Sequence, residues 1–106
     1  MSKEALKRIE ENKKSKEETL DLSACDLKEL PKELEELVWL TSLFCYDNQI
    51  SDLNPIANLS NLTSLYCSEN QISDLNPIAK LSNLMTLSCS KNQISDLNPI
   101  IKFFNL

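Results

Sequence analysis

The sequence predicts an α/β solenoid, with four short parallel strands on a concave face, short turns or 3-10 segments on the convex side, and a helix over the N-terminal end. Two observations predict this fold. The blocks that begin at residues 40, 62 and 84 are near copies of one another, so the chain repeats every 22 residues, and self-similarity at such a period is typical of solenoids. A charged segment precedes the repeats, where a solenoid needs a cap.

The first element is expected to be a capping helix within residues 1–18. Ser2 is a suitable N-cap, and Ala5, Leu6 and Ile9 form an apolar stripe on one helical face. We interpret this helix as a lid on the first strand, with a partner-binding helix as the alternative. Residues 19–106 are then the repeat array, with four units of which the last is incomplete and uncapped.

Each repeat is predicted to contain one strand, one corner and one returning segment. In the copy from 62 to 83, Leu65 and Cys67 are two residues apart, which is the spacing of a strand. The later apolar residues are three apart, as in a chain that winds around a common interior. Pro77 excludes a helix through the preceding residue and favours a short helical turn that begins there. A divergent copy at 20–31, with one extra residue, supplies the fourth strand.

An asparagine recurs directly after each of the three similar strands. An amide has two donors and an acceptor, so it can satisfy backbone groups that a corner leaves unpaired. We therefore predict a structural ladder rather than a ligand-binding role for Asn48, Asn70 and Asn92.

An aspartate recurs before each proline turn. Such a carboxylate commonly accepts a hydrogen bond from a backbone N–H two residues on, which presets the turn. This role is favoured over cation binding for Asp52, Asp74 and Asp96.

A cysteine recurs in one inward-facing column. Parallel neighbours spread their sulfur atoms along the stack, whereas a metal site needs ligands that converge. Adjacent parallel strands also match disulfide geometry poorly. We predict that Cys45, Cys67 and Cys89 are buried small apolar residues of the core.

The segment "LTSLYCSENQI" at 62–72 resembles the leucine-rich repeat pattern L-x-x-L-x-L-x-x-N/C-x-L, with Cys67 in place of a leucine. The repeat length and the segment "NQISDLNPI" are most similar to the bacterial internalin class. The opening helix followed by "TLDLS" resembles the leucine-rich arrays of Roco-type proteins. The resemblance implies a solenoid with an asparagine ladder, and it indicates fold more strongly than function.

The positions that vary between repeats lie on the exposed face of the predicted sheet. Alternation places Phe44, Tyr46 and Tyr66 on neighbouring strands of this face, and we expect the three rings to touch. Exposed aromatic residues rimmed by polar ones are typical anchors for a protein partner. The predicted partner-binding residues are Phe44, Tyr46, Tyr66, Asp47, Glu69, Ser68, Ser88 and Lys91.

The composition favours a binding module over an enzyme. The 106 residues contain no glycine and no histidine, so a glycine-rich phosphate loop and the commonest general base are missing. We predict no catalysis, no cofactor and no metal. The net charge of −5 argues against nucleic acid and anionic membranes as partners. The N-terminal segment lacks the apolar stretch of a secretory signal, so we expect a cytoplasmic protein.

The C-terminal end is expected to expose apolar side chains and an open strand edge. Leu106 aligns with Leu62 and Leu84, the first residue of each strand block. Either the chain is a fragment of a longer array, or another subunit covers this end through self-association. The predicted function is a protein–protein interaction module that binds a protein or peptide on the concave face. The alternative is the recognition part of a larger signalling protein, such as a Roco-type GTPase or kinase.

Overall fold

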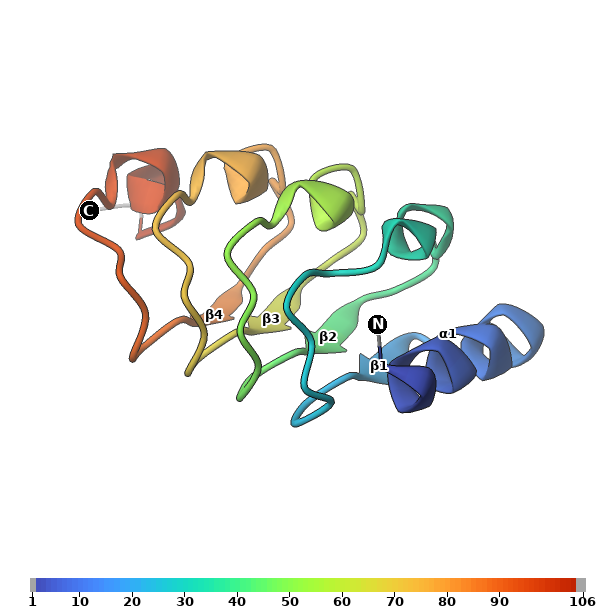
Figure 1. The fold of residues 1–106 in the computed structure, drawn as a ribbon. Helices are drawn as coiled ribbons and strands as arrows, with labels where there is room; N and C mark the ends of the chain where they lie inside the picture. The colour runs from blue at the N-terminus through green and yellow to red at the C-terminus, as the bar shows by residue number, and fades with distance from the viewer. Residues whose placement is uncertain (1, 105–106) are drawn as a thin grey trace.

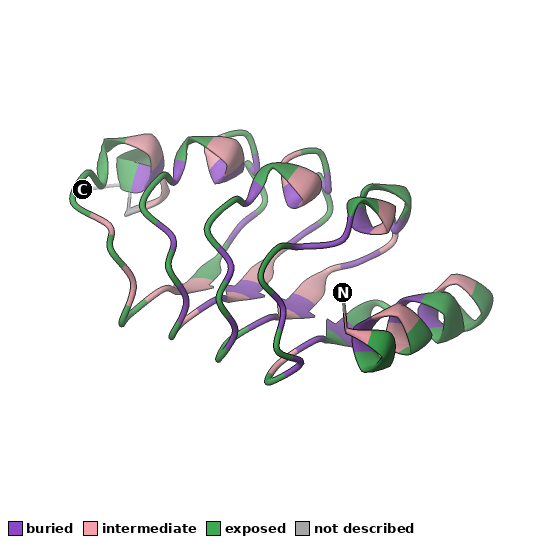
Figure 2. Ribbon diagram, in the orientation of Figure 1, coloured by how far each residue is buried: buried purple, intermediate pink, exposed green. Residues whose placement is uncertain are grey.

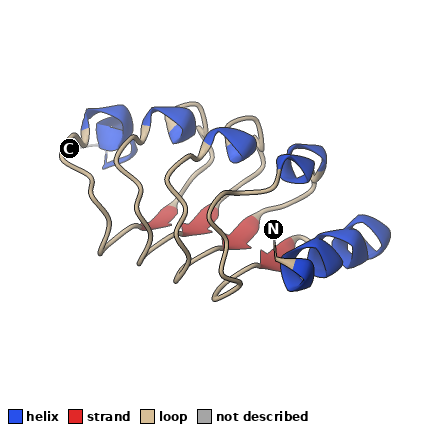
Figure 3. Cartoon of the chain, in the orientation of Figure 1, coloured by secondary structure: helices blue, strands red, loops and turns tan. Residues whose placement is uncertain are grey.

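A computed structural model describes residues 2–104 of the chain. It contains one four-stranded parallel sheet whose strands follow chain order, with short 3-10 helices on the opposite side of each coil (Figures 1 and 3). The predicted fold class is therefore confirmed. The elements are α1 (Lys3–Ser15), β1 (Thr19–Asp21), η1 (Lys32–Glu36), β2 (Ser42–Phe44), η2 (Asn54–Ile56), β3 (Ser64–Tyr66), η3 (Asn76–Ile78), β4 (Thr86–Ser88) and η4 (Asn98–Phe104).

The strand register follows the sequence repeat. Leu43 of β2 pairs with Leu65 of β3, and Leu65 pairs with Leu87 of β4, each 22 residues further on. Leu20 of β1 pairs with Leu43, so the first unit has the predicted extra residue. The side chains of one sequence column therefore lie side by side across the sheet.

The sheet lines the inner, concave side of the solenoid. The 3-10 helices fan out more widely than the strands in Figure 1, because a helix is broader than the roughly 4.8 Å spacing of neighbouring strands. The units must then curve toward the sheet. Exposed strand side chains face into this concavity.

The aspartate before each proline turn makes the predicted local bond. The carboxylate of Asp74 accepts a hydrogen bond of 2.9 Å from the backbone N–H of Asn76, and Asp52 accepts one of 2.8 Å from Asn54. Pro77 then stands at the start of η3, where its fixed φ suits a helical turn. The repeated segment thus turns the chain back toward the next strand.

The asparagine ladder is also present. The Asn70 side chain accepts a hydrogen bond from the N–H of Ile50 at 2.9 Å and donates to the carbonyls of Cys45, Cys67 and Ser68 at 3.0 to 3.2 Å. Asn48 and Asn92 repeat this arrangement in their own units. Each amide thereby ties one repeat to the one before it.

The core is a continuous column of leucine, isoleucine and cysteine inside the coil (Figure 2). Cys45 and Cys67 are fully buried, which confirms their core role, and both are free thiols. Burial fails in the last unit, where Cys89 is only half-buried. Leu97 is 55% exposed, whereas the equivalent Leu75 is 1% exposed.

Helix α1 begins and packs much as predicted. The Ser2 hydroxyl accepts a hydrogen bond from the N–H of Ala5 at 3.2 Å, as an N-cap does. Ala5 and Ile9 are fully buried, but the buried face continues to Asn12. The predicted third member, Leu6, is only half-buried at its edge. Met1 and Leu106, which the sequence analysis placed in the cap and in a further strand, lie outside the described residues.

Candidate binding site on the concave face

The exposed side of the sheet carries two stacked aromatic rings. Phe44, Tyr66 and Ser88 are register partners on β2, β3 and β4. The rings of Phe44 and Tyr66 lie 4.4 Å apart between centroids, with an interplanar angle of 6°. Both side chains are half-buried, so the pair forms a fixed apolar ridge on the concave face.

The predicted contact of all three rings is wrong for Tyr46. Its register neighbour, 22 residues further on, is Ser68 rather than an aromatic residue, and no ring stacking joins it to Phe44 or Tyr66 within residues 2–104. Because Tyr46 stands two residues beyond Phe44 along the chain, it belongs to the next column. Tyr46 is 43% exposed and stands beside the ridge.

Three serine hydroxyls lie beside the rings. The Oγ atoms of Ser68 and Ser88 are 2.8 Å apart, and the hydroxyl of Ser90 donates to Ser68 at 3.2 Å. Serine is small, so these positions leave space where the neighbouring column carries a ring. They form a polar floor next to the aromatic ridge.

The corner residues directly after the strands adopt left-handed backbone conformations. The φ angles of Asp47, Glu69 and Lys91 are 58°, 58° and 55°. This region favours glycine, and the chain has none. The Lys91 ammonium lies 3.4 Å from the Glu69 carboxylate, and both side chains are exposed. The corner thus sets charged groups along the edge of the concave face.

These groups enclose one shallow hollow, which we call the concave hollow, with a volume of about 250 Å³. All of the predicted partner-binding residues except Asp47 line it, and Ser90 completes it. Sequence reasoning missed Ser90 as a member of the set, although it occupies the same column as Tyr46 and Ser68. The residues that line the concave hollow are Phe44, Tyr46, Tyr66, Ser68, Glu69, Ser88, Ser90 and Lys91.

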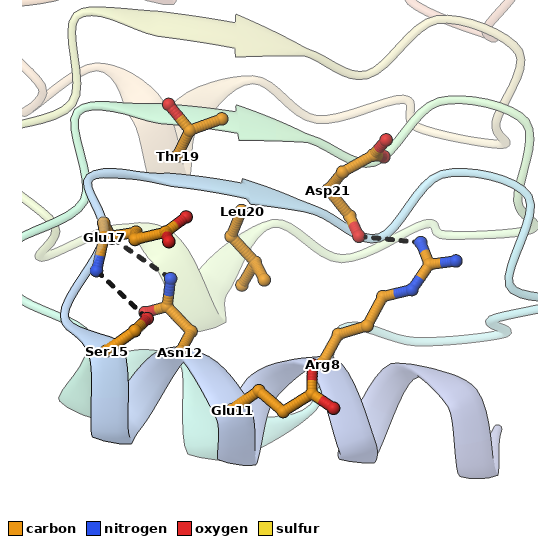
Figure 4. Close-up of a pocket in the computed structure, with 8 residues that line it drawn as sticks. All are labelled: Arg8, Glu11, Asn12, Ser15, Glu17, Thr19, Leu20 and Asp21. Carbon is orange, nitrogen blue, oxygen red and sulfur yellow. Dashed lines mark hydrogen bonds between the residues drawn. The ribbon is translucent and has the colours of Figure 1, made fainter.

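A larger hollow of about 460 Å³ lies between α1 and β1 (Figure 4). Its polar groups are already engaged: Arg8 donates to the carbonyl of Asp21 at 2.9 Å, and Asn12 donates to that of Glu17 at 3.0 Å. Asn12 also accepts a bond of 2.8 Å from the indole N–H of Trp39. This hollow is the seam through which the cap is fastened to the edge of the sheet.

The thiols of the core are poor nucleophiles. Burial raises the pKa of Cys45 to about 12 and also raises the pKa of Cys67, and the thiolate is the reactive form. Within the part of the chain that the structure describes, no three His, Cys, Asp or Glu side chains converge as metal ligands. No helix of residues 2–104 is long and apolar enough to cross a membrane.

The parallel register, the asparagine ladder and the cap define a leucine-rich repeat solenoid. Residues 60–102 match the family model of leucine-rich repeats in two copies. The array is a leucine-rich repeat array of the internalin-like kind.

Two internalins of Listeria monocytogenes are similar in structure. InlF is 39% identical with a TM-score of 0.67, and the match covers 73% of this chain and 23% of that one. InlC2 is 33% identical with a TM-score of 0.72, and the match covers 81% of this chain and 47% of that one. The chain therefore spans less than half the length of either internalin.

A chain of the Drosophila melanogaster SNF/U2A′ complex is also similar. It is 28% identical with a TM-score of 0.63, and the match covers 77% of this chain and 50% of that one. No protein of curated function matches the sequence significantly.

Proposed function

We propose that the concave face binds a segment of a protein partner and performs no catalysis of its own. Leucine-rich repeat domains are in general protein-interaction modules, and one similar chain belongs to a protein complex. The observation that carries the proposal is the stacked pair of Phe44 and Tyr66 beside the exposed ring of Tyr46. Rigid aromatic side chains at the centre of a polar rim are the usual anchors of protein interfaces.

The charges around the rings favour a basic segment of the partner. Asp47 and Glu69 stand at neighbouring corners, and Lys91 is the nearest cation, already paired with Glu69. Complementary charge at the rim increases the rate of association and selects among partners. The aromatic residues then supply affinity, and the carboxylates supply orientation.

Affinity capture with matched variants tests the proposal. The wild type and a Tyr46→Ala/Tyr66→Ala variant are immobilised and exposed to the same cell extract. The control is Asn58→Ala/Lys80→Ala, because these residues occupy equivalent exposed positions after η2 and η3 on the convex side. We expect a protein that the wild type and the control retain and the aromatic variant does not.

Folding of the aromatic variant is checked by its urea unfolding midpoint, which we expect to fall only slightly because both rings are partly solvent-exposed. A partner that binds the aromatic variant and the wild type equally well contradicts the proposal. Loss of binding by the convex control instead would place the interaction on the other side of the coil.

We also infer that the C-terminal end takes part in self-association. Met85 is 85% exposed and Ile101 is 58% exposed. Near them, Leu87 and Phe103 line an apolar hollow of about 310 Å³. The outer edge of β4 has no strand partner within residues 2–104, and open edges with few charges favour pairing.

Sedimentation equilibrium over a wide concentration range tests self-association. We expect a dimer at high concentration and a monomer for Met85→Lys/Ile101→Lys, since charge on both exposed positions opposes apolar contact. A wild type that stays monomeric throughout contradicts the inference. Membership of a larger signalling protein such as a Roco-type GTPase, and a cytoplasmic location, stay predictions.

A further inference from the structure

The aromatic column of the concave face ends in an open slot. Phe44 covers one face of the Tyr66 ring, and the register partner on the other side is Ser88. A serine side chain is too short to cover a phenol ring. Both residues line the concave hollow, so the second face of Tyr66 forms one of its walls. A flat group that enters above Ser88 continues the stack.

The floor of the slot offers hydrogen-bond acceptors. Ser68, Ser88 and Ser90 are joined by two hydrogen bonds of 2.8 and 3.2 Å. Each hydroxyl oxygen has two lone pairs, so two bonds among three hydroxyls leave most of the accepting capacity unused. The slot therefore suits a group with several N–H donors.

The rim of the slot favours a positive charge. Glu69 lies at the edge of the concave hollow, with Asp47 at the next corner and Asp21 in register with Phe44. Lys91 is the cation of this rim; its side chain is 75% exposed, and its 3.4 Å contact with Glu69 is a surface ion pair. Exposed ion pairs contribute little, so an incoming cation can replace Lys91 at the carboxylate.

We propose that the concave hollow takes the guanidinium group of an arginine from the protein partner. The planar cation stacks on the free face of Tyr66 and donates hydrogen bonds to the serine floor and to the Glu69 carboxylate. The assignment rests on the proposed function, because it names the side chain that the concave face receives.

Two other occupants match the slot less well. The ammonium of lysine is a point charge that cannot stack flat on a ring. An aromatic side chain stacks on Tyr66 but leaves the hydroxyls and the carboxylate without donors, and unpaired buried polar groups are unfavourable. Arginine alone satisfies the wall, the floor and the rim together.

NMR titration of the isotope-labelled chain tests the arginine assignment. The probes are N-acetyl-argininamide, N-acetyl-lysinamide and N-acetyl-tryptophanamide, each added to millimolar concentration. We expect saturable shifts of the amide signals of Ser88 and Glu69 with the arginine probe, at several-fold lower concentration than with the other two. The response should weaken as salt increases.

Three variants localise the response. Tyr66→Leu keeps an apolar side chain without the ring face and should abolish saturation. Glu69→Gln keeps the shape of the side chain and should weaken binding several-fold, with less dependence on salt. Asn58→Ala on the convex side should bind like the wild type. Unchanged amide signals of the core residues in each spectrum show that the variant is folded.

The assignment is overturned if the arginine probe produces no saturable shift at Ser88, if lysine or tryptophan binds as well, or if Tyr66→Leu and Glu69→Gln respond like the wild type. Its failure is separable from failure of the proposed function. Capture of a protein that depends on Tyr46 and Tyr66, without arginine binding, leaves the concave interface intact. Arginine binding without such capture leaves the slot and removes the interface.

Discussion

The phenyl ring of Phe44 lies parallel to the phenol ring of Tyr66 across the boundary between β2 and β3, with 4.4 Å between their centroids. The pairing follows from the repeat, because the two residues occupy the same column 22 residues apart. The contact both fixes the rings that are proposed to bind a partner and links two units of the solenoid.

A double-mutant cycle measures this contact. Phe44→Ala, Tyr66→Ala and the double variant should show a coupling free energy of about 0.5–1.5 kcal/mol, the usual value for an aromatic pair. A second cycle of Tyr46 with Tyr66 is the control, since these rings do not stack, and should give a coupling near zero. Equal coupling in both cycles would argue against the column assignment.

Removal of the ladder amide from the middle of the array should strongly destabilise the fold. Asn70→Ala leaves the N–H of Ile50 and the carbonyls of Cys45 and Cys67 without this partner. Each unsatisfied buried group costs about 1–3 kcal/mol, so we expect a loss of about 3 kcal/mol in urea unfolding. The half-buried Asn92 is the matched control, and Asn92→Ala should lose less than half as much. Equal losses would contradict the dependence on burial.

A glycine at one left-handed corner should stabilise the chain. Ala24 has a φ of 52° and an exposed side chain. Ala24→Gly removes the steric strain of this conformation and should raise the free energy of unfolding by about 0.5–1 kcal/mol. Ala79→Gly, at a φ of −62° after η3, should lower it by about as much. Thermal unfolding of both variants checks the opposite signs; a loss of stability on Ala24→Gly would contradict the strain at that corner.

Alkaline solution should destabilise the fold through the buried thiols. Unfolding returns the pKa of Cys45 from about 12 to its ordinary value of 9.0, and the pKa of Cys67 is likewise raised in the folded chain. Because a raised folded pKa gives stability that is lost as pH rises, the free energy of unfolding should fall from about pH 9 toward pH 12. The slope is about 1.4 kcal/mol per pH unit for each thiol.

The matched variant is Cys45→Val/Cys67→Val, which keeps apolar side chains in the column and removes both titrating groups. Its unfolding free energy should decline less steeply over the same pH range, while its lysines and tyrosines titrate as in the wild type. Parallel pH profiles for the two proteins would show that other groups cause the alkaline loss.

Most of the fold was predictable because the repeat fixes the register. Once Leu43 and Leu65 are aligned in the sequence, the strand pairing, the inward cysteines and the asparagine ladder follow from the geometry of a coil. The same alignment places Ser88 beside Tyr66. It also shows that Tyr46 has a serine as its neighbour, so the error about the third ring came from ignoring the two-residue step along the strand.

The contacts of the first unit were not predictable in this way. Asn12 and Trp39 lie outside the regular repeats, so no alignment pairs them, although Asn12 continues the helical spacing of Ala5 and Ile9. The left-handed corners were also missed, because Glu69 and Lys91 are not residue types that indicate a positive φ. Only the folded chain shows that the corner turns the two side chains onto the rim of the hollow.

The central claim is that the varied residues of the concave face bind the partner, while the repeated segment holds the scaffold. It is tested most directly by the backbone amide spectrum of the labelled chain with and without the protein captured by the wild type. We predict that the perturbed signals cluster at 44–47, 66–69 and 88–91 and that those of η2 and η3 stay in place. Perturbations centred on the repeated segments 54–58 and 76–80, with the signals around Tyr66 unchanged, would contradict the claim.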